Sequence, residues 1–75
     1  MTNKRTIIHV DSSMIDQATY NHEHNTLVVR FKNTKTEYEY HDVPGRLFHG
    51  LFSAVSKGKF LYKHVINSPF TYERL

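Results

Sequence analysis

The sequence contains no cysteine, which excludes a disulfide framework, a thiolate metal site and a thiol nucleophile. It also has no apolar run long enough for a membrane span or for the apolar core of a signal peptide. We therefore expect a cytoplasmic protein with no membrane partner. Of its 75 residues, 39% are hydrophobic and 13% aromatic, and this composition favours one small folded domain over a disordered chain.

Positive charge is concentrated in the second half of the chain. The net charge is +3, and acidic and basic residues are balanced in residues 1–40, so the whole excess falls in residues 41–75. A negatively charged partner would be steered towards that half. The alternative is an ordinary solvated surface, because an excess of this size is common.

Alternation of apolar and polar residues predicts an antiparallel sheet of three consecutive strands, over residues 14–20, 26–31 and 36–41. A short apolar stretch at Ile7–Val10 is typical of an edge segment, and we expect a last short strand at Phe70–Tyr72. Residues 1–6 are polar and basic, which predicts a flexible tail. The single domain then spans residues 7–75.

The register of the hairpin between residues 26–31 and 36–41 can be predicted from which side chains would face the core and which would face solvent. If Phe31 pairs with Thr36, aliphatic residues meet aromatic ones on the inner face and opposite charges meet on the outer face. A slip of one residue would instead bury Glu37 and Glu39. The expected pairs are Arg30 with Glu37, Val29 with Tyr38, and Leu27 with Tyr40.

Beyond residue 43 the apolar spacing changes to that of helices. One face of a first helix carries Leu47, Phe48, Leu51, Phe52 and Val55. Pro44 suits its first turn, and Gly50 would permit close contact between this helix and the sheet. Ser56 is placed to cap a second helix, which ends before Pro69. The predicted fold class is α+β: a three-stranded antiparallel β-meander, two helices packed on one face, and a short C-terminal strand.

A series of short motifs carries a family resemblance. They are Val10-x-Ser12-Ser13-x-Ile15, Tyr20, Leu27-x-Val29-x-Phe31, Tyr38-x-Tyr40, Val43-Pro44, Ala54-x-Ser56-x-Gly58-x-Phe60 and Phe70-x-Tyr72. In order and spacing they resemble the KTSC domain, which is named for the C-terminal region of some lysyl-tRNA synthetases and is also found as stand-alone bacterial and phage proteins. The resemblance covers residues 10–72. It implies RNA binding as a working suggestion and no catalytic residues. The positions that carry over as structural motif are Tyr38, Tyr40, Ser56 and Gly58.

The Tyr38-x-Tyr40 motif has two interpretations. Two rings on one face of a strand can stack nucleic-acid bases. Their alternation with Glu37 and Glu39, however, places them on the inner face of the sheet, which the helices must cover. We therefore expect core tyrosines whose hydroxyl groups reach the sheet edge.

Basic residues near the helix starts are the candidate binding site, because phosphates favour helix N-termini. The segment Ser56-Lys57-Gly58-Lys59 is not a P-loop, since it lacks the second glycine and the Gly-Lys-Ser/Thr core. The predicted nucleic-acid contacts are Arg46, Lys57, Lys59, Tyr62 and Lys63. Tyr72 is a second candidate for stacking a base, and a solvated face is the alternative for the whole set.

Metal binding and catalysis are not expected. The His22-x-His24 turn offers too few ligands for structural zinc, and the other histidines are scattered. Ser12 and Ser13 lack the sequence context of a nucleophile elbow, and so short a chain does not readily form a deep substrate pocket. We expect no enzyme activity, no cofactor and no small-molecule substrate.

Two functions remain. The first is a small non-enzymatic module that binds RNA or another nucleic acid through the basic helix-turn. The second is a protein–protein interaction module, such as a phage or bacterial factor that docks on a host or cellular protein.

Overall fold

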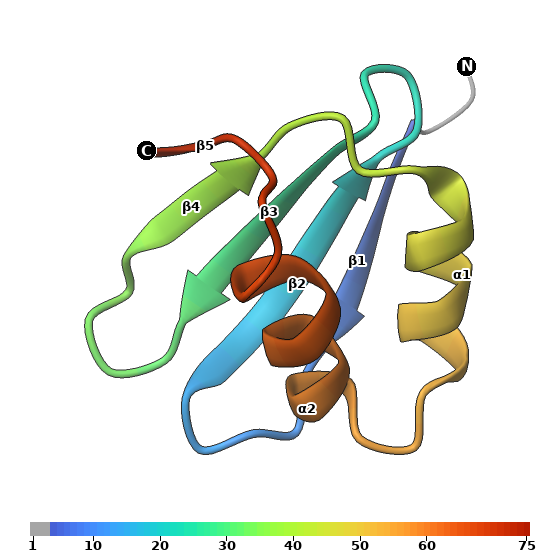
Figure 1. Ribbon diagram of the computed structural model, residues 1–75. Coiled ribbons are helices and arrows are strands. Elements are labelled where there is room, and N and C mark those ends of the chain that lie inside the picture. Colours follow the sequence, from blue (N-terminus) through green and yellow to red (C-terminus); the bar gives the residue numbers. More distant parts are fainter. Residues whose placement is uncertain (1–3) are drawn as a thin grey trace.

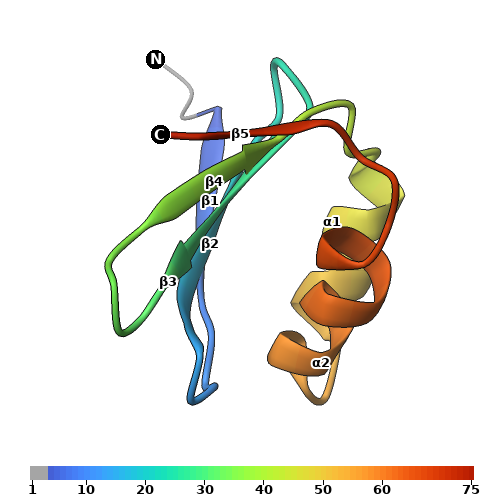
Figure 2. The same ribbon diagram turned by 60° about the vertical axis from the view of Figure 1, so that its left-hand side comes forward.

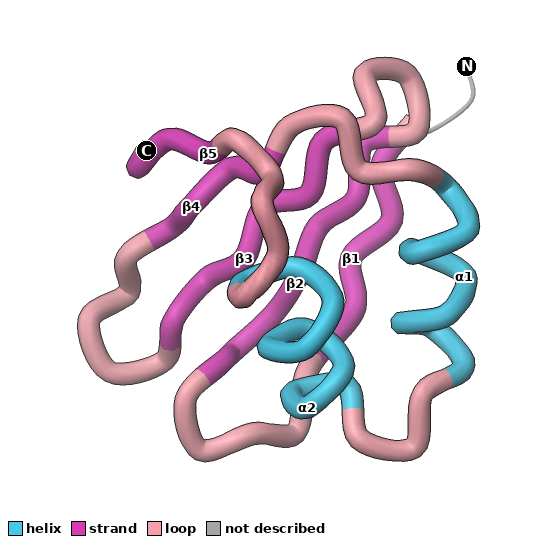
Figure 3. Tube along the Cα trace, in the orientation of Figure 1, coloured by secondary structure: helices cyan, strands magenta, loops and turns pink. Residues whose placement is uncertain are grey.

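The computed structural model describes residues 4–75 and shows an α+β fold built on one antiparallel sheet (Figure 1). The sheet has five strands, and their order in space is their order along the chain (Figure 3). They are β1 (Arg5–His9), β2 (Ile15–Asn21), β3 (Thr26–Phe31), β4 (Glu37–Tyr40) and β5 (Tyr72–Arg74). The α+β class and the antiparallel arrangement are thus confirmed, with a sheet larger than predicted.

Three helical segments cover one face of the sheet and leave the other face open (Figure 2). They are α1 (Gly45–Ser53), α2 (Lys57–Leu61) and η1 (Tyr62–Ile66). The π-helical turn η1 continues α2 without a break, so the two together form the second predicted helix. Within residues 4–75, none of these helices has the length and apolar character needed to cross a membrane.

The predicted register of the hairpin between β3 and β4 is confirmed. The structure pairs Arg30 with Glu37, Val29 with Tyr38, and Leu27 with Tyr40. At the loop end, the backbone N–H of Phe31 donates to the carbonyl oxygen of Thr36 over 2.9 Å. The alternation of apolar and charged side chains was therefore sufficient to fix the pairing.

The expected charge pair on the outer face has a different partner. Arg30 lies opposite Glu37 in register, but its Nη2 lies 2.9 Å from Oδ2 of Asp16 on β2. A β-bulge between Ile15 and Gln17 takes Asp16 out of the regular pairing and turns its carboxylate towards Arg30. The hydrogen bond from Arg30 lowers the pKa of the Asp16 carboxyl below its ordinary value.

The start of the chain contributes more to the sheet than predicted. The apolar stretch at its beginning belongs to a full edge strand, β1, which pairs along its whole length with β2. The flexible tail expected over residues 1–6 is therefore wrong for Arg5 and Thr6, while residues 1–3 lie outside the described part of the chain. The polar side chains of Arg5 and Thr6 hid this strand, because they break the apolar pattern by which a strand is recognised.

The last strand lies slightly later than predicted. It runs over Tyr72–Arg74 rather than Phe70–Tyr72, and it pairs Tyr72 with Tyr40 and Arg74 with Tyr38. Two of its three residues are charged. The position of β5 is determined by its pairing with β4, which the chain reaches only after the helices. The local sequence therefore carries little information about where this strand begins and ends.

The core between sheet and helices contains Tyr20, a buried tyrosine whose hydroxyl group has a hydrogen-bond partner. Tyr20 is 2% exposed, and its ring stacks on Phe48 of α1 with centroids 4.8 Å apart. Its hydroxyl donates to the carbonyl oxygen of Val43 over 2.7 Å, and burial raises the pKa of this phenol. Of the two motif tyrosines expected in the core, Tyr40 is buried, whereas Tyr38 is only half-buried.

Helix α1 is shorter than its apolar spacing predicts. Phe48 and Leu51 are buried, but Phe52 is 60% exposed. Val55 is fully exposed, because the helix ends at Ser53 and the chain turns before Val55 could face the core. The expectation that Phe52 and Val55 belong to the core face is therefore wrong.

Gly50 allows a close contact between the two helices, rather than between α1 and the sheet. A Cβ atom at Gly50 would lie 2.8 Å from Cζ of Phe60 in α2. The Phe60 ring also packs against the ring of His64, with centroids 4.4 Å apart, which restricts its movement. The expected role of Gly50 in close packing holds, but its partner is a helix.

The substitution Gly50→Ala is expected to lower the free energy of unfolding by up to about 2 kcal/mol, because overpacking against Phe60, at about 1–3 kcal/mol, exceeds the gain in helix propensity of about 1 kcal/mol. Gly45→Ala is the matched control, since a Cβ atom at Gly45 would meet nothing within 4 Å. That control should raise the free energy of unfolding by up to about 1 kcal/mol. Urea unfolding measures both, and equal stabilisation by the two substitutions would contradict the contact.

Candidate functional site

A groove of about 620 Å³ lies between the loop that joins β1 to β2 and the beginning of α2. Figure 1 shows that loop and helix start at the same end of the molecule. We call this feature the lysine groove. It is lined by Asp11, Ser12, Ser13, Met14, Ser56, Gly58, Lys59, Tyr62, Lys63 and Asn67.

A helix cap and a close backbone approach fix the two sides of the lysine groove relative to each other. Ser56 caps α2, because its Oγ accepts a hydrogen bond from the backbone N–H of Lys59 over 3.4 Å. Gly58 lets the helix approach the loop, since a Cβ atom there would lie only 3.1 Å from Cβ and Oγ of Ser12. The Ser12 hydroxyl is itself fixed as an acceptor for the backbone N–H groups of Met14 and Ile15. The Ser56-x-Gly58 motif therefore has a structural role here.

Lys59 and Lys63 supply the positive charge of the groove. They are four residues apart on successive turns, and both are exposed. Among residues 4–75, no carboxylate lies within ion-pair distance of either ammonium group, and Asp11 is the acidic residue on the groove lining. Their charges are therefore available to a negatively charged ligand.

The π-helical turn shapes the far side of the groove. The backbone N–H of Asn67 donates to the carbonyl oxygen of Tyr62 over 3.0 Å, a bond that spans five residues instead of four. Such single π turns are frequent at functional sites. This one places Tyr62 partly in the core and partly on the groove lining, next to Lys63.

The structure separates the five predicted contact residues. Lys59, Tyr62 and Lys63 line the lysine groove together. Lys57 instead binds the end of α1, where its Nζ donates to the carbonyl oxygen of Ala54 over 3.1 Å. Arg46 lies in the first turn of α1, at the end of that helix away from α2 (Figure 1), and nine helical residues span about 13 Å.

A second pocket of about 450 Å³ lies on the helix side of the sheet, beside the hairpin between β3 and β4. We call it the ring pocket. It is lined by Met14, Phe31, Asn33, Thr34, Thr36, Tyr38 and Arg74. A smaller adjoining hollow shares Phe31 and Tyr38 with it and adds Tyr72. Sequence reasoning missed the ring pocket, because it treated Tyr38 as a core residue under a complete helical cover.

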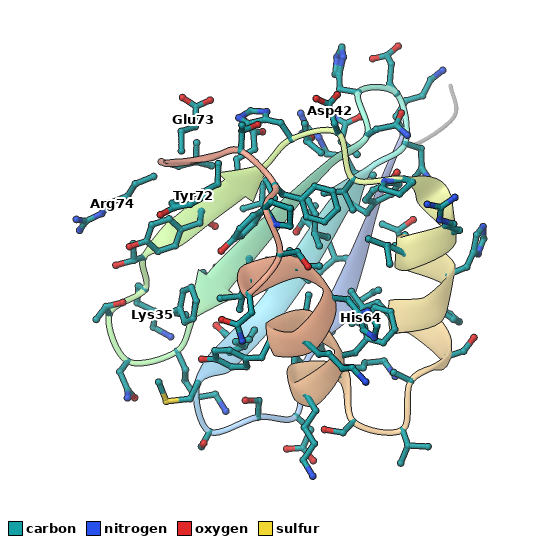
Figure 4. All side chains as sticks on the ribbon, in the orientation of Figure 1. Lys35, Asp42, His64, Tyr72, Glu73 and Arg74 are labelled. Atoms are coloured by element: carbon teal, nitrogen blue, oxygen red, sulfur yellow. The ribbon has the colours of Figure 1, made fainter. Side chains whose placement is uncertain are left out.

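The open face of the sheet carries negative charge at its β4–β5 corner. Glu39 lies opposite Glu73 in register, and Nε2 of His41 lies 3.4 Å from Oε1 of Glu73. Potential ligand atoms of these three residues lie within 4.8 Å of one another, a geometry in which they could hold a metal ion. In Figure 4, Glu73 projects away from Tyr72 and Arg74. Since carboxylates repel phosphates, this corner disfavours nucleic acid, in contrast to the helix side.

Comparison with known proteins gives two concordant findings. Residues 11–70 match the family model of the KTSC domain. Among solved structures, the chain is similar to the crystal structure of a KTSC domain protein from Yersinia pestis, with 31% sequence identity and a TM-score of 0.79. That similarity covers 95% of this chain and 97% of the Yersinia protein. No curated protein matches the sequence.

Proposed function

The chain belongs to the KTSC domain family, and we propose that it is a small non-enzymatic module that binds RNA through the lysine groove. One observation carries this assignment. Lys59 and Lys63 face a groove of about 620 Å³ without a carboxylate partner among residues 4–75. Unpaired lysines of this kind provide the electrostatic part of nucleic-acid binding. A cytoplasmic location, predicted from the sequence, fits such a partner.

The groove favours binding over catalysis. Two of its serine hydroxyl groups serve the backbone: Ser56 caps α2, and Ser12 accepts hydrogen bonds from two N–H groups of its own loop. No histidine lines the groove within the described residues, so the usual general base of a serine nucleophile is missing from its lining. The hydroxyl groups of Ser12 and Ser56 can still donate hydrogen bonds to the oxygen atoms of a phosphate or a ribose.

A specific observation favours protein binding as the second candidate. Strand β1 lies at the edge of the sheet and pairs on one side only, with β2. Its exposed backbone groups could accept an additional strand from a cellular or host protein. Ile7 on this strand is 56% exposed and would add apolar contact.

The test is the salt dependence of binding to a fluorescently labelled single-stranded RNA of mixed sequence, measured by anisotropy. Each phosphate contact on a single strand contributes a slope of about −0.7 in a plot of log affinity against log salt. Two lysine contacts therefore predict a slope of about −1.4 for the wild type. The variant with Lys59→Gln and Lys63→Gln should lose that dependence.

Absence of binding to RNA and DNA at low salt would overturn the assignment. Affinity purification from a bacterial lysate, analysed for both protein and nucleic acid, then separates the two candidates. Recovery of RNA that high salt releases supports the lysine groove. Recovery of a stoichiometric protein, lost when Ile7 is replaced by Lys, supports the edge of β1 instead.

A further inference from the structure

The ring pocket combines aromatic walls with a polar rim, which suits a flat ligand with polar edges. Phe31 and Tyr38 form the walls, with ring centroids 5.7 Å apart and ring planes at 85° to each other. Asn33, Thr34 and Thr36 bring amide and hydroxyl groups to the rim. The volume of about 450 Å³ lies within the range of roughly 300–1,000 Å³ that is usual for small-ligand sites.

The pocket is open because the helices cover only part of the sheet. In Figures 1 and 2 the hairpin between β3 and β4 extends beyond α2 and η1. Phe31 and Tyr38 on that hairpin are consequently half-buried rather than enclosed. Met14, which also lines the pocket, is 48% exposed. The faces of these rings are thus accessible to a ligand.

The charge of the side chains that line the ring pocket favours an anionic ligand. Arg74 lies opposite Tyr38 on β5, and among residues 4–75 its guanidinium has no carboxylate within ion-pair distance. No acidic residue lines the ring pocket. An anionic ligand with planar groups fits both the charge and the rings, because aromatic faces and guanidinium planes both stack on bases.

Met14 connects the two sites, since it lines the ring pocket and also the lysine groove. One chain-like ligand can therefore reach Lys59 and Lys63 at one end and Phe31 and Tyr38 at the other. A base enters such a pocket only when it is free of its own stack and pair, which requires a single strand.

We propose that the ring pocket holds a base of a single-stranded RNA whose phosphates contact the lysine groove. This inference rests on the proposed function and adds the strandedness and the location of a base. Stacking on aromatic rings accepts every base, so the pocket gives strand selectivity with little sequence selectivity.

The first experiment compares a single-stranded RNA with an abasic strand of equal length, which keeps the phosphates and lacks the bases. The wild type should prefer the RNA by at least about fivefold, the lower end of the effect of stacking one base. Tyr38→Leu should remove this preference. Phe70→Leu, which replaces a half-buried aromatic residue that lines neither site, is the control and should keep it.

A second measurement uses the unaltered protein and does not depend on how a variant folds. The Met14 methyl resonance in an NMR spectrum should shift more on addition of the RNA than on addition of the abasic strand, because the ring current of a nearby base adds to any effect of phosphates in the lysine groove. An unmoved Met14 methyl at saturation would overturn the inference.

The outcomes separate this inference from the proposed function. Equal affinity for both strands, with the expected salt slope, leaves RNA binding intact and overturns the ring pocket as a base site. Loss of preference in Phe70→Leu but not in Tyr38→Leu overturns it too. If neither strand binds, the proposed function fails, and this inference fails with it.

Discussion

Replacing both Lys59 and Lys63 by glutamate is expected to weaken RNA binding by at least about 100-fold. Hydrogen bonds from charged groups are worth about 1.5–3 kcal/mol each, and two of them correspond to about two decades of affinity. The new carboxylates would in addition repel the phosphates. Both side chains are exposed and outside the core, so the fold should remain intact. Anisotropy titrations at low salt, with circular dichroism as the folding check, measure the effect.

The matched control changes the same amount of charge elsewhere. Each reversal removes two units, so the double variant takes the net charge from +3 to −1. Lys4→Glu combined with Arg46→Glu produces the same net charge at exposed positions outside the groove. If the control weakens binding as strongly, then overall charge and not the lysine groove attracts the RNA.

Leu61→Ala is expected to lower the free energy of unfolding by about 2–5 kcal/mol, the usual effect of truncating a fully buried leucine. Leu61 is 0% exposed and ends α2, where it joins the helix to the core. A domain of 75 residues has a total stability of roughly 4–11 kcal/mol. The variant should therefore melt about 8–40 °C below the wild type, and at the upper end of this range it would be partly unfolded at room temperature.

Val55→Ala is the control for Leu61→Ala, because Val55 is an aliphatic residue that is fully exposed. Its melting temperature should stay close to that of the wild type, since exposed positions contribute within about 0.5 kcal/mol. Thermal denaturation followed by circular dichroism compares the two. If the Leu61→Ala variant has the same melting temperature as the wild type, then α2 does not anchor the helical layer.

The sequence was most informative for structural features that depend on residues close together along the chain. The hairpin register followed from the alternation of Glu37, Tyr38, Glu39 and Tyr40, because only one pairing keeps both carboxylates out of the core. Lys59 and Lys63 were both predicted as nucleic-acid contacts, and the structure places both on the lysine groove.

The missed features depend on distant parts of the chain. Arg74 joins Tyr38 only because β5 returns to the sheet after the helices, and no local pattern announces that pairing. The exposure of Tyr38 depends on how far α2 and η1 extend over the sheet. The hydrogen bond from Lys57 to the carbonyl oxygen of Ala54 was not predicted, because charge patterns do not show where α1 ends.

The sequential strand order has a consequence for folding kinetics. Strands β1 to β4 each pair with the next strand along the chain, so their contacts form across short connections with small entropic penalties. Only β5 must close a long loop, which contains every helix, before it can reach β4. The meander can therefore assemble early, and Arg74 reaches Tyr38 in a late step, which makes the wall of the ring pocket the last part of the sheet to form.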